Sequence, residues 1–147
     1  MNLNVNRTPF QYRSSNNSLQ KAIGKRIKEL GINVHDGYSN APVYPYVKLG
    51  DELSSERLMS KETYGEFHNI TLYIWSDFPT TMEVKAIGSA IIDVLINSPL
   101  PLDNGFCVTD QTLDHSNYVE ADQASQNISR GFLYLDFEVA DSLKKPI

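Results

Sequence analysis

The chain has 147 residues, 41% of them hydrophobic, with 13 basic and 18 acidic side chains and a net charge of −5. This length predicts one globular domain with a sizeable core, because about 100–200 residues is the usual span of a domain. No run of about 18 apolar residues is present, which excludes a membrane-spanning helix, and the first residues lack the apolar segment of a signal peptide. The single cysteine, Cys107, excludes an internal disulfide framework and favours a reducing compartment.

The charge is unevenly distributed along the chain. Residues 1–30 hold six basic side chains and one acidic one, and the remainder is strongly acidic. An acidic body disfavours nucleic-acid binding, since affinity rises with each phosphate that is neutralised. The basic segment is therefore either a solvated helix face or a docking stripe for an acidic surface, with direct nucleic-acid binding as a third alternative.

Residues 1–15 predict an N-terminal arm, and residues 16–147 predict a single α+β domain. At the start of the arm, asparagines alternate with Leu3 and Val5, a strand-like pattern that Pro9 and a polar run then interrupt. Such an arm is either frayed or ordered only by pairing with another chain.

The first helix is the clearest local prediction. Asn17 with Gln20 resembles a capping box, and Gly31 supplies the stop. Apolar residues recur at steps of three and four residues as one stripe: Leu19, Ala22, Ile23, Ile27 and Leu30. The opposite face carries three lysines, Lys21, Lys25 and Lys28. Arg26 falls inside the apolar stripe, so it either snorkels to the edge or meets a carboxylate or a partner chain.

Strands are predicted next. Residues 33–36 form a short candidate, and Pro42 and Pro45 mark an extended approach to a strand that starts at Tyr46. Residues 51–65 are polar and charged, which is typical of a long hairpin arm or a flexible loop. Residues 66–75 carry bulky side chains on both faces, which indicates a central strand covered on both sides, in part by a neighbouring subunit.

The second half of the chain adds one helix and two strands. Thr80 with Glu83 predicts a capping box, an apolar stripe runs to Leu95, and Pro99 stops the helix. Gly88 inside this helix indicates a close approach to a neighbouring element. Residues 106–118 alternate loosely as a strand, residues 120–127 form a polar loop, and residues 130–139 form the last strand. The predicted fold is α+β, with two helices packed on a mainly antiparallel mixed sheet in the order α-β-β-β-α-β-β.

Chemistry-bearing motifs are scarce. The three histidines, His35, His68 and His115, lack metal-ligand spacing and are expected at the surface or on strand faces. Cys107 lies between Phe106 and Val108 and is expected to be buried and inert. Neither a serine-hydrolase elbow nor a phosphate-binding loop is present. The sequence therefore predicts no catalytic residue, no metal site and no cofactor.

One face of the predicted sheet has no helix left to cover it. That face carries Tyr73, Trp75, Phe132 and Tyr134, which is the best physical indication of self-association.

Taken together and in order, these segments resemble the tail-completion proteins of long-tailed phages and prophages, structural proteins of the tail-terminator type. The resemblance covers residues 19–139 and rests on the segments APVYPYVKLGD, HNITLYIWS, EVKAIGSAIIDVL and RGFLYLDFEV. The chain departs from it in a longer Asn-rich arm and in a polar insert around residues 114–127.

The resemblance implies a structural virion protein rather than an enzyme. It would form a ring, usually of six copies, that caps the tail tube at the head-proximal end of the tail and joins the head connector. Its partners would be further copies of itself, the tail tube protein and the head connector or stopper protein. DNA would pass through the ring without specific binding, and no membrane is involved. The protein would be found in the virion and, during assembly, in the host cytoplasm.

Three surfaces are candidate contacts. The aromatic residues Tyr73, Trp75, Phe132 and Tyr134 would form the seam between copies. The hairpin residues Glu52, Glu56, Arg57, Lys61 and Glu62 would contact a neighbour or the tube. The lysines Lys21, Lys25 and Lys28 would meet an acidic partner. Two alternatives stay open: a monomeric small-molecule-binding or enzymatic α+β domain with the aromatic face as its pocket, and a nucleic-acid-associated module that uses the basic helix.

Overall fold

The computed structural model describes residues 13–35, 43–58 and 63–143. In chain order the elements are α1 (Asn16–Glu29), β1 (Asn33–His35), β2 (Tyr46–Leu58), β3 (Tyr64–Ser76), α2 (Met82–Leu95), β4 (Phe106–Val119) and β5 (Ser129–Asp141). This order confirms the predicted α+β fold with its α-β-β-β-α-β-β succession.

A five-stranded sheet forms one layer of the molecule. Its strand order is β1-β2-β3-β5-β4. The short β1 pairs parallel to β2, and the other neighbours pair antiparallel, so the sheet is mixed. β3 is central, as predicted. Residues 51–58 belong to β2 and pair with the start of β3, which confirms the hairpin over that stretch; the predicted contact residues Lys61 and Glu62 lie outside the described residues.

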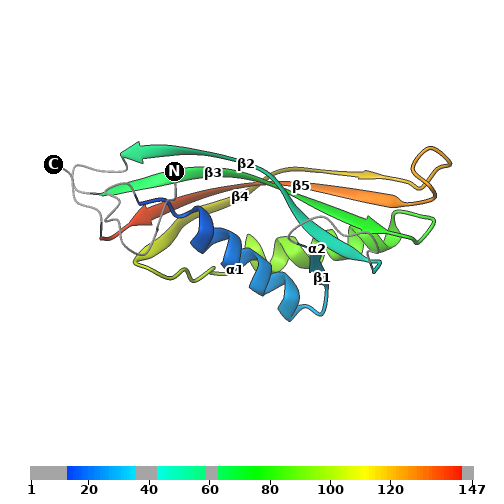
Figure 1. Ribbon diagram of the computed structural model, residues 1–147, viewed down its shortest axis with the longest axis horizontal. Helices are drawn as coiled ribbons and strands as arrows, with labels where there is room; N and C mark the ends of the chain where they lie inside the picture. Colours follow the sequence, from blue (N-terminus) through cyan, green and yellow to red (C-terminus); the bar gives the residue numbers. More distant parts are fainter. Residues whose placement is uncertain (1–12, 36–42, 59–62, 144–147) are drawn as a thin grey trace, which may run out of the picture.

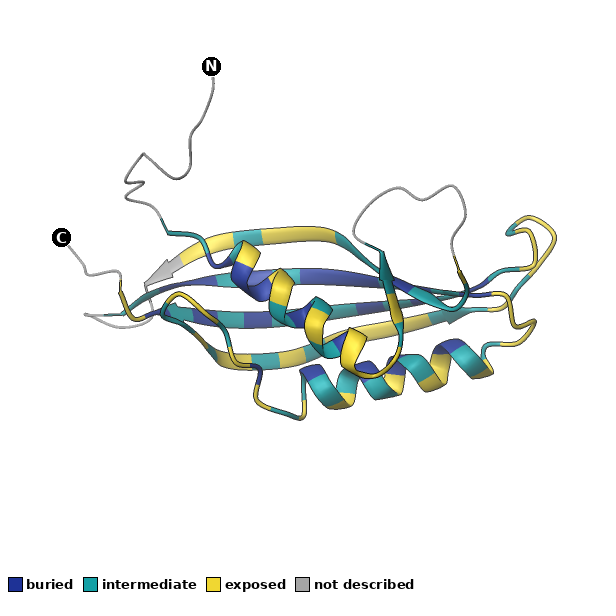
Figure 2. Cartoon of the chain, turned by 60° about the horizontal axis from the view of Figure 1, so that its bottom comes forward, coloured by how far each residue is buried: buried dark blue, intermediate teal, exposed yellow. Residues whose placement is uncertain are grey.

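Both helices lie on the same face of the sheet and form the second layer (Figure 1). Their apolar stripes face the sheet, as the periodicity predicts. The fully buried helix residues are Leu19, Ile23 and Ile27 of α1 and Val84, Ile91 and Leu95 of α2. They pack on the inward residues of β3 and β5, such as Leu72 and Leu135. The core therefore lies between the helices and one sheet face only (Figure 2).

Strand β4 alternates loosely because it contains two bulges. Its register to β5 shifts between Val108 and Asp110 and again between Leu113 and His115. Each bulge adds one residue and so changes which side chain faces the helices. The expectation of a buried Cys107 is wrong: Cys107 is exposed, because it lies opposite Ala140 on the face that carries no helix.

Neither predicted capping box forms, because α1 begins earlier and α2 begins later than those boxes require. The residue before α1 is Ser15, and the residue before α2 is Thr81; neither side chain caps its helix. Glu83 instead accepts a hydrogen bond from Ser76 Oγ of β3 at 2.8 Å. The predicted stop of α1 is confirmed, since Gly31 adopts φ +80° just after the helix.

Arg26 has a tertiary role that the sequence left open. Its guanidinium donates to the carbonyl oxygens of Val94, at 3.3 Å, and Pro99, at 2.7 Å. These carbonyls lie at and just beyond the C-terminal end of α2, where unpaired carbonyls favour a cation. Arg26 thus joins the two helices through backbone atoms rather than through a carboxylate.

The close approach predicted at Gly88 is confirmed. A β-carbon placed on Gly88 would lie 2.3 Å from Tyr118 Oη of β4. Because Gly88 has no side chain, α2 packs directly against Tyr118.

Candidate functional site

By strand register and burial, the four predicted seam residues share one face of the sheet, and both helices lie on the other face (Figure 1). Tyr73 of β3 is registered opposite Phe132 of β5, and their rings meet edge to face with centroids 5.6 Å apart. Trp75 lies 5.7 Å from Tyr73 along β3. Tyr134 follows Phe132 on the same face of β5. All four are half-buried, because the rings shield one another and no helix among the described residues covers them.

The ring system is wider than the sequence predicted. Tyr46 of β2 packs 4.9 Å from Trp75 and continues through Tyr44 and His35 toward the β1 edge. On the other side, His115 of β4 stacks on Tyr134 at 4.0 Å. Strand pairing sets these neighbours, so they could be found only with the register known. We call this set of rings the aromatic face.

A bulge in β2 makes room for the central ring. The register of β2 to β3 shifts between Leu49 and Glu52, and a β-carbon on Gly50 would lie 2.1 Å from the Tyr73 ring. Partial burial raises the pKa of Tyr73, and the negative charge of Asp51 adds to this rise. Burial also raises the pKa of Tyr46. Both phenols are therefore neutral near neutral pH and can donate hydrogen bonds.

Acidic side chains adjoin the rings on the β4 and β5 side. By register, Asp136 and Glu138 of β5 share the face with Phe132 and Tyr134, and Asp110 of β4 lies opposite Glu138. The carboxylate of Asp114 reaches His115 Nδ1 at 2.8 Å.

The predicted contact residues of the hairpin differ in their surroundings. Glu56 is exposed, and Arg57 pairs with Gly65 through its place in β2. Glu52, however, turns toward the helix-covered face, where its Oε1 lies 3.3 Å from Nδ1 of His68. Glu52 is itself exposed, so this contact within its own chain leaves part of the residue open to solvent.

His68 lies on a strand face, the second of the two predicted places, and is fully buried there. Its Nε2 lies 2.7 Å from Ser15 Oγ. Ser15 in turn donates to Glu66 from its backbone nitrogen at 2.6 Å and from its hydroxyl at 2.8 Å.

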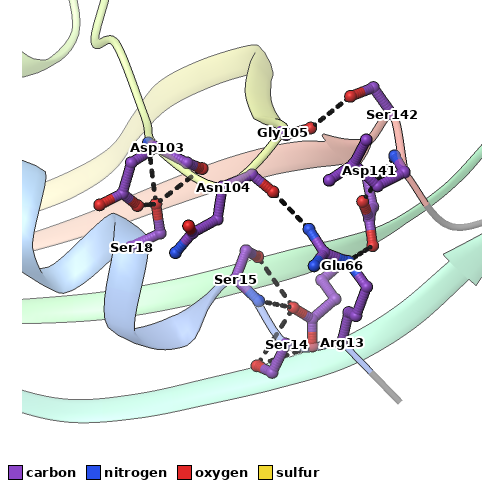
Figure 3. A network of polar contacts seen from close by, with 11 residues as sticks. Arg13, Ser14, Ser15, Ser18, Glu66, Asp103, Asn104, Gly105, Asp141 and Ser142 are labelled. Atoms are coloured by element: carbon purple, nitrogen blue, oxygen red, sulfur yellow. Dashed lines mark hydrogen bonds and ion pairs between the residues drawn. The ribbon is translucent and has the colours of Figure 1, made fainter. Parts of the chain in front are cut away.

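A polar network surrounds the start of α1 at this end of the sheet (Figure 3). Arg13 Nε pairs with the buried Asp141 at 2.9 Å, its guanidinium also donates to the carbonyl of Asn104, and it lies over the Phe106 ring. Residues 13–15, assigned to the arm in the sequence analysis, are thus packed against the sheet, while the rest of that arm lies outside the described residues.

The predicted basic surface is present on the outer side of α1. Lys21, Lys25 and Lys28 are all exposed (Figure 2) and line a shallow hollow with Gly24 and Glu29. Lys21 is partly neutralised by Asp103, with its Nζ 3.0 Å from Oδ2. Within the described part of the chain, neither Lys25 nor Lys28 forms an ion pair.

The described residues offer little for catalysis. They contain no group of three or more His, Cys, Asp or Glu side chains that could hold a metal ion. One series of contacts has the order of a serine-hydrolase triad: Ser15, His68 and Glu52. However, Ser15 is only 1% exposed, and its hydroxyl already donates a hydrogen bond to Glu66. A substrate carbonyl would have no path to that oxygen. Nor is any helix among the described residues long and apolar enough to cross a membrane.

Comparisons with known proteins identify the family of this chain. A search of curated proteins finds no significant match. Among 21 similar solved chains, one from the virion of a native gene transfer agent particle has a TM-score of 0.72 and 20% identity, and the match covers 88% of this chain and 99% of that one. At this identity the likeness establishes the fold. A model of the family "Tail completion protein gp17" matches residues 15–137. Since that match spans most of the chain, the protein belongs to the tail completion protein gp17 family of structural viral tail proteins.

Proposed function

We propose that this chain caps the phage tail tube as a ring of six copies and joins the tail to the head connector during assembly. The family membership supports a role in tail completion. The fold it shares with a chain of a gene transfer agent virion is consistent with a place in the virion; within the virion, the proposal puts it at the head-proximal end of the tail. The partners of this ring are the tail tube protein and the head connector or stopper protein, and assembly takes place in the host cytoplasm.

The observation that carries the proposal is the aromatic face. Rings from all five strands lie on this face, most of them half-buried, without a helix to cover them in the described residues. Large aromatic side chains supply much of the binding energy of protein interfaces. In this role Tyr73, Trp75, Phe132 and Tyr134 form the seam between copies, and the protein has no enzymatic activity.

The charge of the chain suits a channel for DNA. With a net charge of −5, the body repels phosphates, so DNA passes through the ring without specific binding. The exposed hairpin residue Glu56, with Arg57, Lys61 and Glu62, contacts the neighbour or the tube. Glu52 belongs to the same surface, and its carboxylate also lies 3.3 Å from His68 of its own chain.

The test is electron microscopy of a lysate from a phage or induced prophage that lacks this chain. We expect full heads beside separate tails, and joined particles once the purified protein is added back. Normally joined particles in its absence would contradict the proposal. The protein would then be screened for small-molecule binding as a stable monomer and for salt-sensitive DNA binding.

A further inference from the structure

The symmetry of a closed ring restricts what the aromatic face can contact. In a cyclic ring of more than two copies, each contact is heterologous: one surface of a copy meets a different surface of the next. Two aromatic faces cannot pair with each other throughout such a ring. The complementary surface must lie elsewhere on the same chain, and on a different side of it.

The outer side of α1 meets this geometric condition. The molecule has two layers, and the helices lie on the face of the sheet opposite the aromatic face (Figure 1). Leu19, Ile23 and Ile27 bind α1 to the sheet, so the exposed Lys25 and Lys28 point away from it. The two surfaces therefore lie on opposite sides of each copy, as head-to-tail packing requires.

The chemistry of the two surfaces is also complementary. The α1 surface offers two lysines without an ion-pair partner among the described residues, and Gly24 in the same hollow leaves open space with no atom within 4 Å of a β-carbon placed there. The opposite side offers the faces of tyrosine, tryptophan and phenylalanine rings, adjoined by the exposed Asp110 and Asp114. Ammonium groups bind aromatic ring faces and carboxylates alike.

We infer that the lysine surface of α1 on one copy docks on the aromatic face and its acidic border on the next copy of this chain. This inference rests on the proposed ring and names the second surface of its seam. Lys25 and Lys28 lie toward Asp110 and Asp114 of the neighbour, and the aromatic rings supply the apolar part of the contact.

A charge-exchange experiment tests the pairing in the lysate assay. Lys25→Glu with Lys28→Glu, and separately Asp110→Lys with Asp114→Lys, are each expected to lower the number of joined particles at least about tenfold, since a loss of 1.4 kcal/mol in one contact is tenfold. All four changes in one chain exchange the charges on every copy and are expected to restore joining. Glu120→Lys, an exposed change at the start of the β4–β5 loop, is the control and should have no effect.

Cross-linking gives a readout that does not need heads or tails. In a Cys107→Ser background, Lys25→Cys combined with Thr112→Cys places one thiol on each surface, and a short bismaleimide should produce a ladder of linked copies. Each single-cysteine variant should give no ladder.

The outcomes separate the two proposals. If wild-type protein joins particles but neither charge reversal affects joining, the inference is wrong and the proposed function stands. If wild-type protein does not join particles, the proposed function fails. The cross-linking ladder alone then tests whether the lysine surface of one copy contacts the aromatic face of the next. Absence of a ladder, or dimers formed by Lys25→Cys alone, would overturn the inference.

Discussion

Gly88 and Gly24 occupy equivalent interior positions in two helices but have opposite surroundings. A β-carbon at Gly88 would meet Tyr118 Oη at 2.3 Å, whereas one at Gly24 meets nothing within 4 Å. We expect Gly88→Ala to lower the free energy of unfolding by about 1–3 kcal/mol through overpacking. Gly24→Ala should raise it by up to about 1 kcal/mol through helix propensity. Urea denaturation of both variants measures the difference.

A companion substitution identifies the cause of the Gly88 effect. Because the nearest atom is the tyrosine hydroxyl, Tyr118→Phe should recover part of the stability that Gly88→Ala loses. Additive losses in the double variant would show that the hydroxyl is not the obstacle.

The hydrogen bonds to the Asp103 carboxyl predict that the stability of the fold depends on pH. The hydrogen bond from Ser18 Oγ, and then that from Lys21, hold the pKa of this carboxyl below its ordinary value. A carboxyl with a lowered folded-state pKa contributes stability above its unfolded pKa of about 3.9, and this contribution is lost as the pH falls through the folded value. Asp103→Asn should therefore flatten the acid limb of a stability-against-pH curve. Ser18→Ala should flatten it more than Lys21→Met, and identical slopes in the wild type and Asp103→Asn would contradict the assignment.

At the scale of elements, Arg26 fastens α1 to the end of α2. Arg26→Met keeps the apolar stem but removes the donors to the carbonyls of Val94 and Pro99. We expect a loss of about 1–2 kcal/mol, because hydrogen bonds from charged groups exceed neutral ones and these are partly exposed. Thermal unfolding measures it. Lys25→Met, one residue away and exposed, should change stability by less than about 0.5 kcal/mol.

The start of α1 is fastened to β3 by Ser15. Ser15→Ala removes the partner of the buried His68 Nε2 and one donor to Glu66, and an unpaired buried polar group costs about 1–3 kcal/mol. Ser14→Ala is the matched control, because Ser14 reaches Glu66 only at 3.2 and 3.3 Å and is half-buried. Because Ser14 Oγ also accepts from the backbone N–H of Asn16, hydrogen exchange is compared at the amides of residues 17–20, where it should rise in the Ser15 variant and stay near wild type in the Ser14 variant.

At the scale of the whole molecule, the aromatic face separates folding from assembly. Trp75→Ala should leave the subunit folded, because Trp75 is half-buried on the face away from the core, yet reduce ring formation by about 30-fold or more, as expected for an interface hot spot of 2 kcal/mol. Analytical ultracentrifugation beside circular dichroism distinguishes the two effects. Phe78→Ala, an exposed aromatic on the β3–α2 connection, serves as control, and equal loss of fold and ring in Trp75→Ala would place the tryptophan in the core.

Much of the fold was predictable because its signals are local. Apolar residues at helical spacing placed α1 and α2, Gly31 ended α1, and alternation placed β3 and β5 within one to three residues of their observed ends. The aromatic residues of β3 and β5 could be assigned to one face for the same reason, since side chains alternate along a strand. The burial of Cys107 was predicted wrongly because burial depends on which face of the sheet the helices cover, and neighbouring residues do not encode that.

The elements, their order and an uncovered aromatic surface could be predicted from the sequence, because periodicity and turn chemistry act within a few residues of the chain. The folded structure was needed to show that Arg26 bonds the end of α2, that Glu52 turns inward to His68, that β4 bulges twice, and that the rings extend from His35 to His115. Each of these joins residues at least 15 positions apart or depends on strand register, and register is fixed by packing across the sheet rather than by the local sequence.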